Sequence, residues 1–124
     1  MLSKKGERNV QLINYTPHTI GICRPDGTII TVPSSGEIRV TPIRHSSGTL
    51  PNGVPLQTVT YRPLILPDRQ PDTWLIVSGY VVHRAQIEHP DRNDLICPDT
   101  SRGSLVRNSD GKIIAVRKFV RVGV

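Results

Sequence analysis

The chain has 124 residues, with 16 Lys and Arg against 10 Asp and Glu, which gives a formal net charge of +6. This length fits one domain, since domains commonly contain about 100–150 residues. Eleven prolines and ten glycines favour short elements and frequent turns, and exclude a helical bundle or coiled coil. No apolar stretch approaches the roughly 20 residues of a membrane-spanning helix, and the polar residues 1–9 lack the apolar segment of a signal peptide.

These features predict a soluble, cytosolic domain with a β-rich α+β fold. We expect antiparallel hairpins and one short helix after the central strand, in a single compact domain formed by residues 10–124. Residues 1–9 are expected to be a flexible N-terminus.

In the first half of the chain, extended segments alternate with turns that contain proline or glycine. Asp26-Gly27 supplies the positive φ of a tight hairpin, so the strands on either side of it should pair. The stretch from His45 to Pro55 is rich in Ser, Gly, Pro and Asn and predicts a long loop. The predicted strands are Val10–Tyr15, Thr19–Arg24, Thr28–Val32, Glu37–Ile43 and Leu56–Tyr61.

In the second half, Trp74–Val77 is the most hydrophobic run and predicts the central buried strand. Before it, Pro63–Asp72 contains three prolines and predicts an irregular crossing. Tyr80–Glu88 is ambiguous between strand and helix, but its apolar spacing favours a short amphipathic helix with Ser78 as the N-cap. The remaining predicted elements are the brief buried segment Leu95–Cys97 and a closing hairpin that joins Leu105–Arg107 to Lys112–Val120.

Nothing in the sequence indicates catalysis. The chain has no GxSxG, P-loop, HExxH or GxGxxG motif. Its four histidines, together with Cys23 and Cys97, could form a metal site only if the fold happened to bring them together. Both cysteines are expected to be reduced. We therefore expect no catalytic residue, no metal and no cofactor.

Anion binding is better supported, because 12 of the 16 positive charges are arginines, whose planar fork suits phosphate. Three loops combine arginine with turn residues whose backbone amides could face an anion: Arg24–Gly27, Asp91–Asp94 and Asp99–Ser104. The alternative is that the aspartates in these loops neutralise the arginines in salt bridges. Tyr80 is the nearest candidate for stacking on a base. The arginines form no continuous stripe, so a compact anionic ligand is favoured over long nucleic acid.

Several segments resemble a group of small phage and prophage proteins. Asn14–His18 reads N-Y-T-P-H and is similar to their N-L/Y-T-P-H opening. Further similar blocks follow in order along most of the chain: Ile76–Gly79, Arg92–Leu95, Pro98–Thr100 and Val106–Val116. Within this group, the chain resembles the phage anti-defence proteins of the Thoeris anti-defence 1 type.

This resemblance implies a non-enzymatic homo-oligomer in the host cytoplasm that sequesters a cyclic ADP-ribose-type signal or a cyclic oligonucleotide. It implies a ligand held by arginines, an aromatic residue and an asparagine, with loops from neighbouring subunits. The counterparts in this chain are Arg24, Tyr80, Asn93 and either Arg107 or Arg102, and the loop argument adds Arg92. The alternatives are a phage structural or interaction protein and a nucleic-acid-binding accessory protein. No membrane partner is expected.

Overall fold

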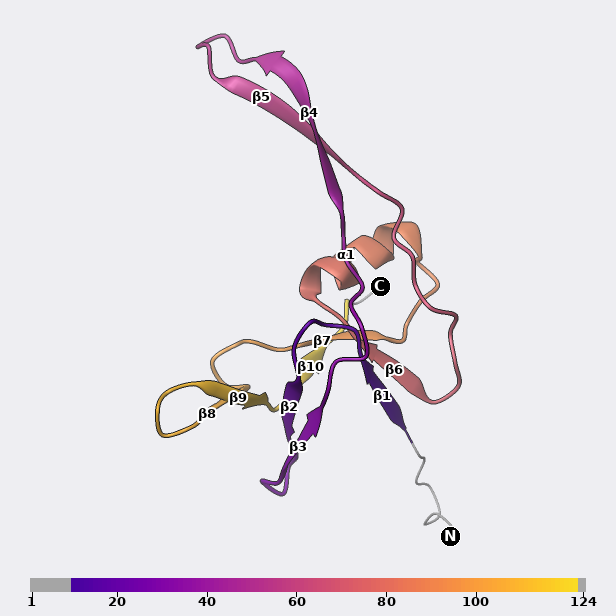
Figure 1. The fold of residues 1–124 in the computed structure, drawn as a ribbon, viewed down its shortest axis with the longest axis vertical. Coiled ribbons are helices and arrows are strands. Elements are labelled where there is room, and N and C mark those ends of the chain that lie inside the picture. Colours follow the sequence, from indigo (N-terminus) through magenta and orange to yellow (C-terminus); the bar gives the residue numbers. More distant parts are fainter. Residues whose placement is uncertain (1–9, 123–124) are drawn as a thin grey trace.

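Ten strands and one short helix make up residues 10–122, the part of the chain that the computed structural model describes (Figure 1). The predicted β-rich fold with a single helix, antiparallel hairpins and one domain is confirmed. The predicted flexible segment 1–9 lies outside the described residues. The elements are β1 (Gln11–Asn14), β2 (Ile20–Cys23), β3 (Ile29–Val32), β4 (Pro42–Thr49), β5 (Pro55–Tyr61), β6 (Thr73–Ile76), α1 (Gly79–Glu88), β7 (Leu95–Pro98), β8 (Leu105–Arg107), β9 (Ile113–Val116) and β10 (Phe119–Val120).

The strands form two four-stranded sheets and a separate two-stranded ribbon. In the first sheet, ordered β1-β6-β7-β10, the strands β1, β6 and β7 run parallel and β10 is antiparallel. Parallel neighbours need a long crossover, and α1 provides it between β6 and β7. The second sheet, ordered β3-β2-β9-β8, contains the two predicted hairpins, β2–β3 and β8–β9, joined by a parallel contact between β2 and β9. The predicted strand Lys112–Val120 is two strands, because β9 ends at Val116 and Phe119–Val120 pairs with β7 in the first sheet.

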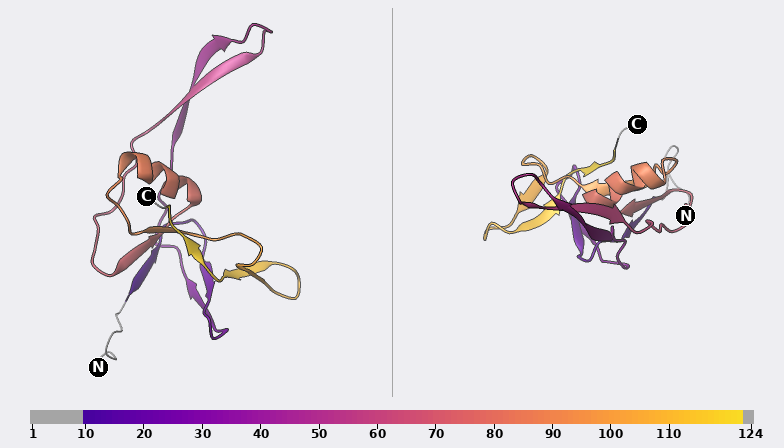
Figure 2. Two further views of the ribbon diagram at one scale, coloured as in Figure 1. Left: turned by 180° about the vertical axis from the view of Figure 1, so that it is seen from behind. Right: turned by 90° about the horizontal axis from the view of Figure 1, so that it is seen from above.

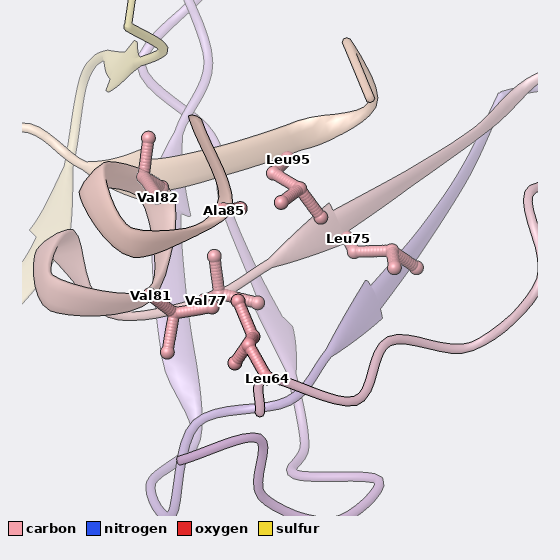
Figure 3. Close-up of a cluster of buried hydrophobic side chains, with 7 residues drawn as sticks. All are labelled: Leu64, Leu75, Val77, Val81, Val82, Ala85 and Leu95. Atoms are coloured by element: carbon pink, nitrogen blue, oxygen red, sulfur yellow. The ribbon is translucent and has the colours of Figure 1, made fainter. Parts of the chain in front are cut away.

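One face of α1 packs against the first sheet and makes the core (Figure 3). The helix contributes its residues at positions 81, 82 and 85, a spacing that places them on one face. It begins as predicted at Ser78, whose Oγ accepts a hydrogen bond from the N–H of Val81 at 3.3 Å. No helix among residues 10–122 is long and apolar enough to cross a membrane. The buried core residues are Leu64, Leu75, Val77, Val81, Val82, Ala85 and Leu95.

The prediction of a loop over residues 45–55 is wrong, because these residues belong to a long β-hairpin. Strands β4 and β5 pair antiparallel and rise away from the rest of the molecule (Figures 1 and 2). We call this hairpin, residues 42–61, the arm. The glycines that suggested a loop have two other structural roles. Gly53 takes a φ of +88° in the tight turn at the tip, and Gly48 takes a φ of +91° at a register shift in β4.

The predicted strand Glu37–Ile43 is also wrong, since β4 begins only at Pro42 and residues 37–41 carry no strand. Ile38 and Val40 instead pack against the core, and the N–H of Ile38 donates to the carbonyl of Tyr15 at 3.1 Å. The alternation of polar and apolar residues therefore marks an extended connector with one face on the core.

Candidate functional site

The six predicted site residues do not meet in one place in the described chain. Tyr80 lies in the first turn of α1, near the base of the arm, and is 82% exposed. Arg24 follows β2 in the turn of the β2–β3 hairpin, and Arg107 ends β8 in the β8–β9 hairpin. Both hairpins extend away from the arm (Figures 1 and 2). Arg102 lies in the exposed loop between β7 and β8. Within one copy of the chain, Tyr80 therefore lies apart from the predicted arginines Arg24, Arg102 and Arg107.

Arg92 is engaged inside the protein. Its Nε and one Nη donate to the two carboxylate oxygens of Asp94, each at 2.9 Å, and its other Nη donates to the carbonyl of Pro67 at 2.8 Å. Burial works to raise the pKa of Asp94, but the hydrogen bonds and charge of Arg92 hold that pKa below its ordinary value. This pair matches the salt-bridge alternative. The neighbouring Asn93 is exposed, and it lines a cleft of about 290 Å³ together with Arg92.

The other two predicted anion-binding loops are filled by their own aspartates. Asp26 accepts the N–H of Thr28 at 2.9 Å and its hydroxyl at 2.6 Å, and these bonds lower the pKa of Asp26. Asp99 accepts the N–H and the hydroxyl of Ser101, both at 3.0 Å, which lowers the pKa of Asp99. In both loops, therefore, an aspartate carboxylate already accepts a backbone N–H that an anionic ligand would need.

The N-Y-T-P-H segment is a structural joint between the two sheets. Asn14 is fully buried at the end of β1. Its Nδ2 donates to the carbonyls of His18 at 2.7 Å and Val32 at 2.9 Å. Its Oδ1 accepts the N–H of Thr16 at 2.9 Å and the Thr16 hydroxyl at 2.6 Å. Since Val32 belongs to β3, the Asn14 side chain links the first sheet to the second.

A different cleft combines aromatic and cationic side chains. It has a volume of about 360 Å³ and lies between the base of the arm and the N-terminus of α1. All three tyrosines of the chain line it, so we call it the tyrosine cleft. Its volume lies at the lower end of the roughly 300–1,000 Å³ that is typical of small-molecule sites. Its lining includes Tyr15, Tyr61, Tyr80, Arg39, Arg44, Ser78 and one acidic residue, Glu37.

Tyr61 is held in place from the side of α1. The guanidinium of Arg84 lies over its ring, 4.6 Å from the centroid, and Arg84 Nε donates to Glu88 at 2.6 Å. The second carboxylate oxygen of Glu88 accepts the N–H of Leu64 at 2.9 Å. This amide and then Arg84 lower the pKa of Glu88, so the carboxylate stays ionised. Tyr61 is still 41% exposed, which leaves part of its ring open to the cleft.

Two arginines and a helix terminus give the tyrosine cleft a positive wall. Arg39 pairs with Glu37 at 3.2 Å, but their side chains are 74% and 38% exposed. Such exposed pairs contribute about 0–1 kcal/mol, so the Arg39 guanidinium can exchange its partner for a ligand phosphate. Arg44 projects from the exposed strand β4. The first turn of α1 has no acidic residue, so the partial positive charge of its N-terminus is unopposed.

Of the ligand residues predicted from the sequence, only Tyr80 lies in this cleft. The predicted anion sites are loops, whereas Arg39 belongs to a core-packed connector, and Arg44 and Tyr61 belong to strands. Tyr15 lies 46 residues before Tyr61, so only the tertiary fold brings the rings together. One signal was available: residues 38–67 contain three arginines and no aspartate or glutamate.

Metal-ligating side chains form no cluster in the described part of the chain. Among residues 10–122, no three His, Cys, Asp or Glu side chains gather closely enough to hold a metal ion. Cys23 and Cys97 are free thiols, and burial raises the pKa of Cys97. His89 Nε2 is hydrogen-bonded to the carbonyl of Leu64 at 2.7 Å.

Comparison with known proteins adds no assignment to this geometry. The chain matches no protein-family model, no curated protein and no solved structure.

Proposed function

We propose that this protein binds a compact anionic nucleotide in the tyrosine cleft and sequesters it without chemical change. The observation that carries the proposal is the meeting of three tyrosines with Arg39 and Arg44 around one cleft. Aromatic rings provide faces on which a base can stack. Guanidinium forks provide paired donors for a phosphate, and the N-terminus of α1 adds partial positive charge.

The contacts available in one cleft set the expected affinity. Two hydrogen-bonded contacts to charged groups contribute about 1.5–3 kcal/mol each, and one stacked base contributes about 1–3 kcal/mol. Their total is about 9 kcal/mol at its upper end, which corresponds to a dissociation constant of about 0.3 μM. Capture at about 1 nM requires about 3 kcal/mol more. A neighbouring subunit could supply that difference, in agreement with the expectation of ligand sites shared in a homo-oligomer.

The similarity of Asn14–His18 and later blocks to small phage proteins narrows the proposal. It favours a cyclic ADP-ribose isomer or a cyclic oligonucleotide as the ligand, and phage anti-defence in the host cytoplasm as the role. Sequestration fits a cleft lined by arginines and tyrosines, since it needs tight binding and no positioned general base. On this proposal the protein is not an enzyme and uses no cofactor.

A ligand panel tests the proposal. Thermal unfolding is followed with cyclic ADP-ribose isomers, cyclic di- and trinucleotides, AMP, inorganic phosphate and a short DNA. We expect one cyclic nucleotide to raise the melting temperature by several degrees, because a ligand that binds only the folded state stabilises it. Chromatography after heat release should recover that ligand intact. Recovery of a cleaved product would make the protein an enzyme, and the absence of a shift with every nucleotide would refute the proposal.

A structural or interaction role in a phage particle is the second candidate. The exposed arm favours it, because a long ribbon that pairs with neither of the two sheets is suited to meeting another protein. Co-purification with virion proteins, combined with no response to the nucleotide panel, would favour this role. The nucleic-acid-binding alternative predicts instead a response to the short DNA.

A further inference from the structure

The arm is exposed and uncharged over most of its length. All but one residue of β4 and all but one of β5 are exposed. From Ser46 to Tyr61 the chain contains no charged residue. Three large apolar side chains near the tip, Leu50, Val54 and Leu56, are 41–49% exposed. Proteins normally protect open strand edges with charges, prolines or bulges, and most of the arm lacks the first of these.

The number of strands in the arm also indicates a missing neighbour. An isolated two-stranded hairpin is at best marginally stable in water, and further strands or packing against a helix are needed for independent stability. The ring contact between the arm and α1, Tyr61 with Arg84, lies at the base of the arm. Neither β4 nor β5 pairs with any other strand of the described chain. A partner that adds strands to the arm would therefore increase the stability of the arm.

The hydrogen-bond register shows which edge is suited to pairing. The N–H of Arg62 donates to the carbonyl of Thr41 at 3.0 Å, just below the pair Pro42 and Tyr61. Because bonded and non-bonded pairs alternate in an antiparallel ladder, Gln57, Val59 and Tyr61 turn their N–H and C=O groups outward from β5.

The two open edges of the arm differ in how well they could pair with another strand. On β4, Pro42 has no N–H to offer and a register shift follows Ser46. On β5, the six residues from Leu56 to Tyr61 contain no proline, no bulge and no charge. The β5 edge is therefore the better template for another strand.

We propose that β5 pairs antiparallel with β5 of a second copy of this chain, so that two arms form one four-stranded sheet. A two-fold axis near Val59 would place Gln57 opposite Tyr61 of the second copy and satisfy the outward groups of both strands. The antiparallel arrangement brings the tip of each arm beside the base of the other. There α1 exposes Ile87 at 69%, which provides apolar surface for the tip outside the tyrosine cleft.

The test measures mass in solution with a matched pair of proline variants, in the absence of ligand. Gln57 and Ser46 are cross-strand partners whose N–H groups point outward from opposite edges of the arm. Gln57→Pro removes a donor from the β5 edge, and Ser46→Pro removes one from the β4 edge. By light scattering after size exclusion, the wild type and Ser46→Pro should have twice the 13.7 kDa of one chain. Gln57→Pro should have the mass of a monomer.

Two results would overturn this proposal. The first is a wild type that stays monomeric at concentrations of tens of micromolar, which would point to a different protein as the partner of the arm. The second is a Gln57→Pro variant that remains dimeric. Circular dichroism of each variant verifies that the domain is folded. The inference does not rest on the proposed function, since neither outcome depends on a nucleotide.

Discussion

Replacing Asn14 by alanine tests whether the N-Y-T-P-H segment acts as a joint of the fold. The side chain makes four hydrogen bonds, two as donor and two as acceptor, at a fully buried position. Alanine removes all four and leaves the Val32 carbonyl and the Thr16 N–H without this partner inside the protein. The two sheets also lose the side-chain link between β1 and β3.

The expected loss of stability in Asn14→Ala follows from the number of hydrogen bonds and from their burial. A hydrogen bond contributes about 1 kcal/mol net, so four of them give about 4 kcal/mol. This is a large fraction of the roughly 5–15 kcal/mol that stabilises a domain. Asn108 provides the matched control. Its Oδ1 accepts the N–H groups of Asp110 at 2.9 Å and Lys112 at 3.0 Å, but in an exposed turn where water can replace it. Asn108→Ala should therefore cost less than about 1 kcal/mol.

Urea unfolding followed by circular dichroism measures both variants. Asn14→Ala should lower the midpoint strongly at an unchanged slope, because stability changes while the surface exposed on unfolding does not. Asn108→Ala should stay close to the wild type. If the free energies of unfolding of the two variants differed by less than about 1 kcal/mol, the hydrogen bonds of Asn14 would not be what joins the two sheets.

Two further predictions concern close packing and charge. Gly21→Ala should cost about 1–3 kcal/mol or more, because a Cβ there would overlap the carbonyl oxygen of Ile114 where β2 meets β9. Gly103→Ala, whose Cβ would meet no atom within 4 Å, should leave the urea midpoint unchanged; equal effects would contradict the packing argument. Arg92→Ala should cost about 3–5 kcal/mol at pH 7, because it leaves the Asp94 carboxylate buried without its partner. In the wild type the lowered pKa of Asp94 stabilises the fold above pH of about 4, and this contribution disappears as the pH falls further. The difference between Arg92→Ala and the wild type should therefore shrink in acid, and an equal loss at pH 3 and pH 7 would disprove the role of this ion pair.

Local signals in the sequence were sufficient where one turn or cap decides the structure. Asp26-Gly27 predicted the β2–β3 hairpin, and Ser78 together with apolar spacing predicted α1. The arm was missed because its glycines and prolines are usually read as a loop, although they form a tight turn and a register shift. The parallel pairing of β1 with β6 joins residues about 60 positions apart. Such pairing depends on tertiary packing, and no local pattern specifies it.

The candidate site was harder to predict for a related reason. The loops that hold Arg24 and Arg102 had the composition of anion sites, but Asp26 and Asp99 occupy their amides in the folded chain. The three tyrosines of the cleft come from three separate elements: Tyr15 follows β1, Tyr61 ends β5 and Tyr80 lies in α1. No single sequence motif therefore contains them. Of the residues of the cleft, only Tyr80 was predicted from the sequence to contact a ligand.

The most direct test of the account compares two double variants against the cyclic nucleotide that the panel identifies, by calorimetric titration. Arg39→Ala with Arg44→Ala removes the positive wall of the tyrosine cleft, whereas Arg24→Ala with Arg107→Ala removes the same charge from the two hairpins outside it. Losing two contacts of about 1.5–3 kcal/mol each should weaken binding at least about 100-fold in the first variant. The second variant should bind like the wild type. Full affinity in the cleft variant, together with a loss in the hairpin variant, would contradict the assignment of the site.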